Sequence, residues 1–357
     1  MTSKIFTTFL VLILTAEFSF GQEGDILLKD YNPVSLYEIQ KTSPVKAKFP
    51  VIDIHSHPYA KSISEIEKWV ATMDKAGIEK TIIQTYQTGE AFDSIYDVYS
   101  KYGDRFEIWC GIDYTGYKEP GWTNKAIKEL VRCYKKGARG IGELGDKGEG
   151  LLYSKPTAAI GMHIDDDRMT PLLKKCGELG MPVSIHVAEP FWMYQPIDEH
   201  NDGLMNAKKW KVDMNKEGIL NHPELIKTLE NAVNKNPETN FIACHFANTS
   251  YDLTILGNLF DKYPNLYADI AARYAETAPI PRRVKKFYNK YPDRLLYGTD
   301  MGMLPSMYST TFRILETEDE HFYQKDLFSY HWPLNGFGLS DQVLNKIYYE
   351  NAKQILH

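Results

Sequence analysis

Two histidines separated by one residue, His55 and His57, are the clearest local sign of chemistry in this chain of 357 residues. They end an apolar run that begins at Val51, and residues i and i+2 of a strand project to the same face. Two imidazole nitrogens at that spacing can bind one divalent ion at about 2.0–2.1 Å. The pair therefore predicts a metal site at a strand end, although such a pair alone is also found as ordinary solvated histidines.

Other residues of the ligand type occupy similar places farther along the chain. His186 lies in the fifth β-rich run, His245 in the sixth, and Asp300 ends the eighth. A grouping at the ends of several strands is better explained by one shared metal site than by separate core histidines. The remaining histidines lie in predicted loops, helices or the tail: His163, His200, His222, His321, His331 and His357.

Short β-rich runs alternate with amphipathic segments of helical period eight times from Phe49 onward, and this alternation predicts a parallel (β/α)8 TIM barrel. In such barrels the active site lies at the carboxyl ends of the strands. The final helix, with apolar residues from Leu344 to Ile355 on one face, is expected to close over the barrel. The predicted strands are Val51–His57, Lys80–Gln87, Phe106–Asp113, Ala138–Leu144, Pro182–Glu189, Asn240–Asn248, Leu266–Ala272 and Arg294–Asp300.

The first residues have the features of a secretory signal peptide. Lys4 precedes the apolar run Ile5–Ala16, and small residues flank a cleavage point near residue 21. We therefore expect residues 1–21 to direct export to the periplasm or the cell exterior. The apolar run is shorter than the roughly 20 residues of a membrane span, so no span is expected.

The rest of the chain is expected to be a strap over residues 22–48 followed by one barrel over residues 49–357. Two stretches depart from the βα alternation, at residues 146–167 and 190–221. They follow the fourth and fifth strands, so we expect both insertions to form walls or lids of the active site.

Composition limits the class of partner. The 41 basic and 47 acidic residues are spread along the chain and form no basic stripe, which excludes nucleic acid and favours a small-molecule substrate. The four cysteines match no zinc motif. We expect four buried thiols, with a bridge between Cys133 and Cys176 as the alternative, and the oligomeric state stays open.

With these motifs in view, the chain resembles the amidohydrolase superfamily, within it the amidohydrolase-related branch that also holds aminocarboxymuconate-semialdehyde decarboxylase-like proteins. The resemblance spans roughly residues 50–357. It rests on Asp53-Ile54-His55-Ser56-His57, Val183-Ser184-Ile185-His186, Phe241-Ile242-Ala243-Cys244-His245, Leu296-Tyr297-Gly298-Thr299-Asp300 and Lys346-Ile347-Tyr348-Tyr349-Glu350-Asn351-Ala352.

The resemblance implies a set of metal ligands: His55, His57, His186 and Asp300, with His245 beside them as a further ligand or a catalytic group. Glu143 ends the fourth strand, where superfamily members with two metals have a bridging residue. It is expected either to bridge two ions or to pair with a helix dipole or an arginine. Zinc is the first expectation for the metal, one or two ions, and manganese or iron also suit these ligands.

The reaction expected first is hydrolysis of an ester, lactone or amide of a small molecule. A bound metal lowers the pKa of water from 15.7 to about 7. Asp300 is expected to act as the base, and His245, if it is not a ligand, to hydrogen-bond the carbonyl oxygen. The alternatives are non-oxidative decarboxylation of an aromatic or unsaturated acid, which the resemblance implies with much the same ligands, and a catalytically silent binding barrel.

Specificity is expected to come from the loops. Trp192 and Tyr194 lie in the aromatic fifth loop and could stack on a ring or sugar, or pack the insertion against the barrel. Arg273 follows the seventh strand and could bind a substrate carboxylate, or form a salt bridge with Glu276 or Glu143.

Overall fold

The computed structural model describes residues 26–147, 151–153, 159–216 and 218–356. The predicted signal peptide, residues 1–21, lies outside the described residues. Residues 26–31 belong to a separate small unit that contains a short 3-10 helix, η1 (Leu28–Asp30), and the second unit spans Asn32–His357.

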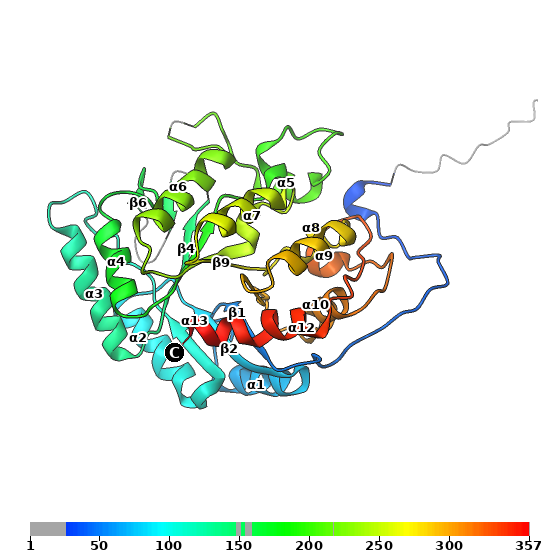
Figure 1. The fold of residues 1–357 in the computed structure, drawn as a ribbon, viewed down its shortest axis with the longest axis horizontal. Coiled ribbons are helices and arrows are strands. Elements are labelled where there is room, and N and C mark those ends of the chain that lie inside the picture. Colours follow the sequence, from blue (N-terminus) through cyan, green and yellow to red (C-terminus); the bar gives the residue numbers. More distant parts are fainter. Residues whose placement is uncertain (1–25, 148–150, 154–158, 217, 357) are drawn as a thin grey trace, which may run out of the picture. The chain divides into compact units, whose positions relative to one another are not determined.

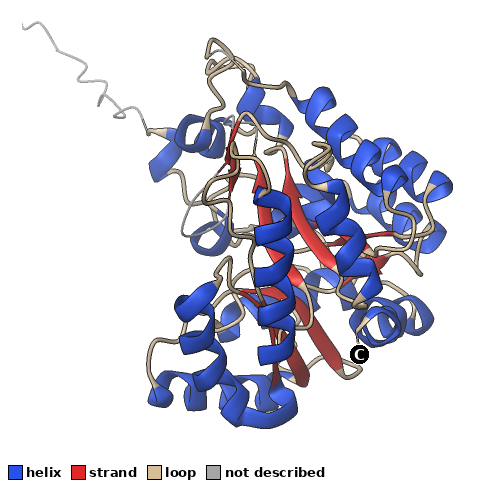
Figure 2. Cartoon of the chain, turned by 90° about the vertical axis from the view of Figure 1, so that its left-hand side faces the viewer, coloured by secondary structure: helices blue, strands red, loops and turns tan. Residues whose placement is uncertain are grey.

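Eight parallel strands form a closed ring. Helices lie around these strands (Figures 1 and 2). Their order is β1, β2, β3, β4, β7, β8, β9 and β10, with a parallel bridge from Cys110 to Ile141 joining β3 to β4. The amide of Ile54 donates to the carbonyl of Tyr297 (2.9 Å), which joins β1 to the last strand. The predicted (β/α)8 barrel is confirmed. Its strands are β1 (Val51–Ser56), β2 (Ile78–Gln84), β3 (Phe106–Trp109), β4 (Ile141–Asp146), β7 (Val183–Val187), β8 (Phe241–Ala243), β9 (Leu266–Asp269) and β10 (Leu295–Leu296).

The helices begin and end with ordinary capping chemistry. Ser62 and Glu65 form a capping box at the start of α1, and Gly77 ends that helix in the left-handed conformation. None of the described helices has the length and apolar character to cross a membrane. They are α1 (Ile63–Ala76), α2 (Gly89–Tyr99), α3 (Trp122–Lys136), α4 (Thr170–Glu178), α5 (Leu204–Trp210), α6 (His222–Lys235), α7 (Leu253–Lys262), α8 (Tyr274–Thr277), α9 (Pro281–Lys290), α10 (Pro305–Glu316), α11 (Lys325–Phe328), α12 (Asp341–Asn345) and α13 (Asn351–Ile355).

The apolar core has two parts. A large cluster packs the helices onto the outside of the strands, and a smaller one gathers side chains of β1, β2, β3, β8, β9 and β10. Ala352 and Ile355 of α13 belong to the smaller cluster, so the last helix closes the barrel as predicted. All four cysteines are buried and none forms a disulfide, which agrees with the expectation of buried thiols.

The two insertions take different forms. The first contains β5 (Leu151–Tyr153) and β6 (Ala159–Ile160), an antiparallel hairpin on β4 that the sequence did not predict. Beyond it, Nδ1 of His163 lies 3.0 Å from Oδ2 of Asp146 at the end of β4. The second contains the 3-10 helix η3 (Phe191–Tyr194) and α5.

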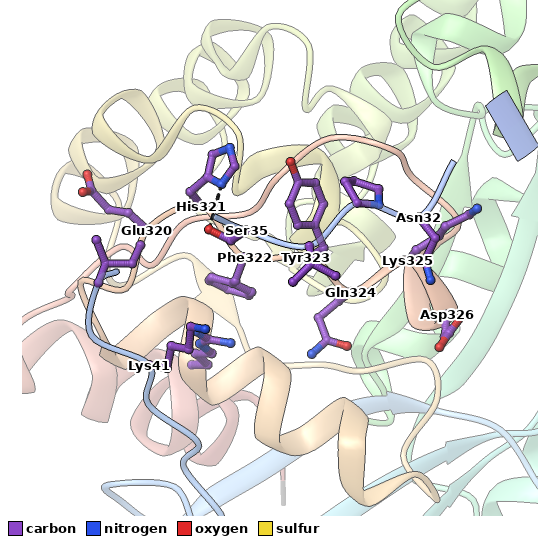
Figure 3. Close-up of a pocket in the computed structure, with 14 residues that line it drawn as sticks. Asn32, Ser35, Lys41, Glu320, His321, Phe322, Tyr323, Gln324, Lys325 and Asp326 are labelled. Carbon is purple, nitrogen blue, oxygen red and sulfur yellow. Dashed lines mark hydrogen bonds between the residues drawn. The ribbon is translucent and has the colours of Figure 1, made fainter. Parts of the chain in front are cut away.

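Within the predicted strap, residues 32–48 contain neither helix nor strand. The amide of Thr42 donates to Asp319 (2.7 Å), which also accepts from Arg313 of α10 (2.8 Å). Part of this segment and residues 320–326 enclose a pocket of about 280 Å³, in which His321 lies 3.2 Å from the hydroxyl of Ser35 (Figure 3). The segment is thus anchored on the barrel.

Candidate metal centre

All six residues predicted as ligands or catalytic groups lie at the carboxyl ends of the strands. They form three groups of three within which the ligand atoms lie within 4.8 Å of one another. The groups are His55, His57 and Glu143; Glu143, His186 and His245; and His55, His245 and Asp300.

Three histidines have Nδ1 fixed by an acceptor outside the cluster. Nδ1 of His55 lies 2.8 Å from Oδ2 of Asp269, that of His57 2.8 Å from the carbonyl of Gln84, and that of His245 2.9 Å from the carbonyl of Ala271. An Nδ1–H that donates to these oxygens leaves the lone pair on Nε2, the tautomer that binds metals. All three Nε2 atoms lie near the cluster carboxylates.

Glu143 lies between the histidines of β1 and those that follow. Its Oε1 is 2.9 Å from Nδ1 of His186, 3.3 Å from Nε2 of His245 and 3.8 Å from Nε2 of His55. Its Oε2 is 3.8 Å from Nε2 of His57. Among the described residues, the ion pairs of Glu143 are all with histidines.

Two tyrosines hold the carboxylates from the side. The hydroxyl of Tyr86 donates to Oε2 of Glu143 (2.6 Å), and that of Tyr59 donates to Oδ1 of Asp300 (3.1 Å). The same Oδ1 of Asp300 is 3.1 Å from Nε2 of His57. Each carboxylate is thereby oriented toward the histidines.

Several of the strand ends turn through residues in the left-handed region, which few side chains other than glycine adopt at low cost. At His245 φ is 58° and at Asp300 it is 64°, while Tyr86, Ala188 and Ala272 follow β2, β7 and β9 with φ of 59°, 60° and 54°. Strain of this kind collects at functional sites. The sharp turns aim the side chains across the barrel mouth.

The electrostatics favour negative carboxylates. Burial alone raises the pKa of Glu143, Asp269 and Asp300, but contacts with the imidazoles outweigh it and the net shift of each pKa is downward. Burial lowers the pKa of His245 to about 4, so this imidazole is neutral at physiological pH. A neutral imidazole among charged carboxylates is the environment that a divalent cation requires.

The donor set fits such a cation. Nε2 of His55 is buried and has no hydrogen-bond partner among the described residues, whereas the buried Nε2 of His186 lies 3.5 Å from Oε2 of Glu189. Buried polar atoms without partners are rare, and Nε2 of His55 lies near other lone-pair atoms. Catalytic metal sites combine several imidazole nitrogens with carboxylate oxygens, and this cluster offers both kinds of donor atom. The residues that would hold the metal are His55, His57, Glu143, His186 and Asp300, with His245 completing a second group.

A cavity of about 390 Å³ lies over the cluster, and we call it the metal-site cavity. Arg273, one of its lining residues, donates from Nε to Asn248 (2.8 Å) and lies 3.5 Å from Glu276. Lys147 also lines it, with Nζ 3.9 Å from Oε1 of Glu189. The cavity thus presents two cationic side chains beside the predicted metal ligands.

The described lining residues of this cavity do not include Trp192 or Tyr194, two of the predicted substrate-binding residues. The hydroxyl of Tyr194 instead accepts from the amide of Glu189 (3.2 Å), and its ring packs edge-on against His222. The same insertion contributes Met193 and Trp210 to the cavity. Tyr194 therefore packs the insertion against the barrel and does not line the cavity.

Sequence reasoning missed four residues of the centre: Asp269, Tyr86, Lys147 and Glu189. Asp269 ends β9, and the others follow β2, β4 and β7 within two residues. Their position at strand ends could have marked them as candidates for the site. Their roles could not be predicted, because these roles depend on contacts between strands that are far apart in the sequence.

Comparisons with known proteins agree with this architecture. No curated protein matches the chain. Among solved structures, it is similar to a TIM-barrel protein from Bordetella bronchiseptica at 16% identity, covering 86% of this chain and 98% of that chain with a TM-score of 0.51.

Two similar structures are decarboxylases with bound manganese. A dihydroxybenzoic acid decarboxylase from a Polaromonas species has 14% identity, coverage of 86% of this chain and 96% of that chain, and a TM-score of 0.54. A 5-carboxyvanillate decarboxylase from Novosphingobium aromaticivorans has 14% identity, coverage of 88% and 99%, and a TM-score of 0.50. At such identities the likeness concerns the fold. A family model described as amidohydrolase matches residues 52–357, and the chain therefore belongs to the amidohydrolase family.

Proposed function

We propose that this protein is a metal-dependent hydrolase that cleaves an ester, lactone or amide bond of a small molecule carrying a carboxylate. The observation that carries the proposal is the position of Glu143 between two groups of histidines. One carboxylate shared by two sets of imidazoles is suited to bridging two ions, and paired ions assist attack on an acyl or phosphoryl centre.

When bound, the metal supplies acidity to a water molecule and polarises the carbonyl group. Asp300 would accept the proton of the water at Oδ1 and return it to the leaving group; this oxygen accepts a hydrogen bond from Tyr59 (3.1 Å) and lies 3.1 Å from Nε2 of His57. His245 is neutral and its Nδ1 donates to a backbone carbonyl, so Nε2 offers a lone pair rather than a proton. This favours the ligand role of His245 over hydrogen bonding to the carbonyl oxygen.

The substrate carboxylate is assigned to the two cations of the metal-site cavity. Arg273 is fixed by Asn248, whose own amide donates to the carbonyls of Val187 and Ala188 (3.0 Å each). A guanidinium held in this way forms charge-assisted bonds with little loss of conformational freedom. Lys147 provides the second positive charge.

The test is metal content per chain. We expect two equivalents of zinc or manganese in the native protein and about one in Glu143→Ala, with loss of hydrolysis. Glu107→Gln is the matched control, because Glu107 is also a buried glutamate of a strand but bonds to Trp109 (2.9 Å). One equivalent in all three proteins would contradict the bridging role.

The second candidate is non-oxidative decarboxylation of an aromatic or unsaturated acid. It is favoured by the two similar decarboxylase structures, which contain manganese. A panel of carboxylated esters, lactones, amides and hydroxybenzoates separates the two reactions. Release of carbon dioxide without release of a new acid would establish decarboxylation instead.

Zinc is our proposal for the native ion, and manganese is the alternative. We also propose that residues 1–21 are a signal peptide that directs export. Fractionation of cells that express the chain, with N-terminal sequencing of the product, tests the second proposal.

A further inference from the structure

A second cavity lies beside the metal-site cavity and shares Glu276 with it. Its volume is about 670 Å³, larger than the metal-site cavity. Tyr330 lines the metal-site cavity and stacks on Trp332, which lines the second, with ring centroids 4.2 Å apart. The two cavities therefore border each other at Glu276 and at this stacked pair.

Four aromatic side chains line this second cavity, which we call the aromatic groove: Phe191, Trp192, Tyr251 and Trp332. Phe191 stacks on Tyr251 at 4.2 Å and 18°, and Trp192 lies 6.2 Å from Trp332 at 34°. They come from η3, from the turn after the 3-10 helix η4 (Cys244–Asn248) and from the loop before α12. Aromatic faces gathered from separate segments are suited to holding a planar ring.

The charges of the groove differ from those of the metal-site cavity. Asp198, Asp202 and Glu276 line it, and none of its described lining residues is a lysine or an arginine. Oε1 of Glu276 accepts from Tyr330 (2.8 Å), whereas Oε2 has no hydrogen-bond partner among the described residues. Such a lining favours hydrogen-bond donors and disfavours anions.

We propose that the aromatic groove binds a planar ring bearing hydrogen-bond donors, which belongs to the same substrate whose carboxylate occupies the metal-site cavity. The assignment of the ring to the substrate rests on the proposed function. Binding of a ring by itself depends only on the groove. The groove therefore selects for substrates with a second, distal ring.

Calorimetric titration of the metal-loaded protein with two neutral naphthalene probes tests the groove directly. We expect saturable binding of 2-naphthol, which is planar and has a donor. Binding of 2-methoxynaphthalene, which lacks the donor, should be at least about tenfold weaker. Equal affinity for the two probes, or no saturable binding of 2-naphthol, would overturn the proposal.

Variants locate the probe. Trp332→Ala and, independently, Tyr251→Ala should weaken 2-naphthol binding about tenfold, whereas Trp210→Ala, at the metal-site cavity, should leave it unchanged. Loss in Trp210→Ala alone would place the probe in the wrong cavity and refute the assignment. Because the titration measures no turnover, naphthol binding without hydrolysis contradicts only the proposed function. Hydrolysis without naphthol binding contradicts only this inference.

Discussion

Asp300 is the residue whose ligand and base roles can be separated by one substitution. Asp300→Asn keeps an oxygen beside His57 but removes the charge, so we expect most of the metal to remain while kcat falls at least about 100-fold. Metal analysis and steady-state kinetics on one preparation measure both. The double variant His55→Ala/His57→Ala, which should bind no metal, is the control for complete metal loss. Turnover near the native rate in Asp300→Asn would remove it as the base.

Arg273 and Lys147 determine, in our proposal, that the substrate carries a carboxylate. Arg273→Gln removes a buried charge-assisted contact, so kcat/KM for a carboxylated substrate should fall about 10- to 100-fold. The matching substrate with a neutral amide in place of the carboxylate should lose little. Lys147→Met provides a second variant, since Arg273 also contacts Asn248. Equal losses for both substrates would show that the two cations hold the cavity together instead.

His163 connects the insertion after β4 to the barrel, because its ring forms a hydrogen bond with Asp146 at the end of β4. The hydrogen bond with Asp146 raises the pKa of His163, and burial raises that of Asp146. Because the folded pKa of His163 is raised, its contribution to stability is complete below about pH 6.5 and is lost as pH rises through the folded pKa.

We therefore expect His163→Gln to reduce the free energy of unfolding near pH 6 by about 1.5 kcal/mol, which lowers Tm by about 3 °C. The decrease in Tm should be smaller at pH 9. Thermal unfolding at both pH values measures the difference. His200→Gln is the matched control, because His200 faces Glu199 (3.6 Å) on an exposed surface and should have no effect. A deficit for His163→Gln that is larger at pH 9 would contradict this role.

The sequence predicts the strands of the barrel better than it predicts the insertions. All eight barrel strands, and the ends at which His55, His186 and Asp300 lie, follow from periodicity, because βα alternation allows few topologies. The β5–β6 hairpin was missed because its strands are two and three residues long. The sequence also does not predict that Trp192 lies outside the metal-site cavity, because this position depends on how η3 packs against Trp332.

At the scale of the whole molecule, the predicted ligands come from β1, β4 and β7 and from the turns after β8 and β10, around the barrel. A metal bound by them ties distant strands together, so its loss should affect unfolding of the barrel as one unit rather than one loop. Without it, Nε2 of His55 remains buried without a hydrogen-bond partner among the described residues, and the negative Glu143 and Asp300 remain close to the histidines.

Chelation should therefore lower the Tm of the whole barrel. Two ions, each present at about 100 times its Kd, stabilise the folded state by about 5 kcal/mol in total, which corresponds to a fall of about 10 °C on their removal. Zinc or manganese added back should restore Tm, and Glu143→Ala should show about half the shift, since it is expected to retain one ion. In the Ala double variant of His55 and His57, chelator should change nothing. If chelation leaves the native Tm unchanged, or melts only part of the chain, then the cluster does not hold the strands together through a metal, and the carboxylates and imidazoles must balance one another by proton transfer alone.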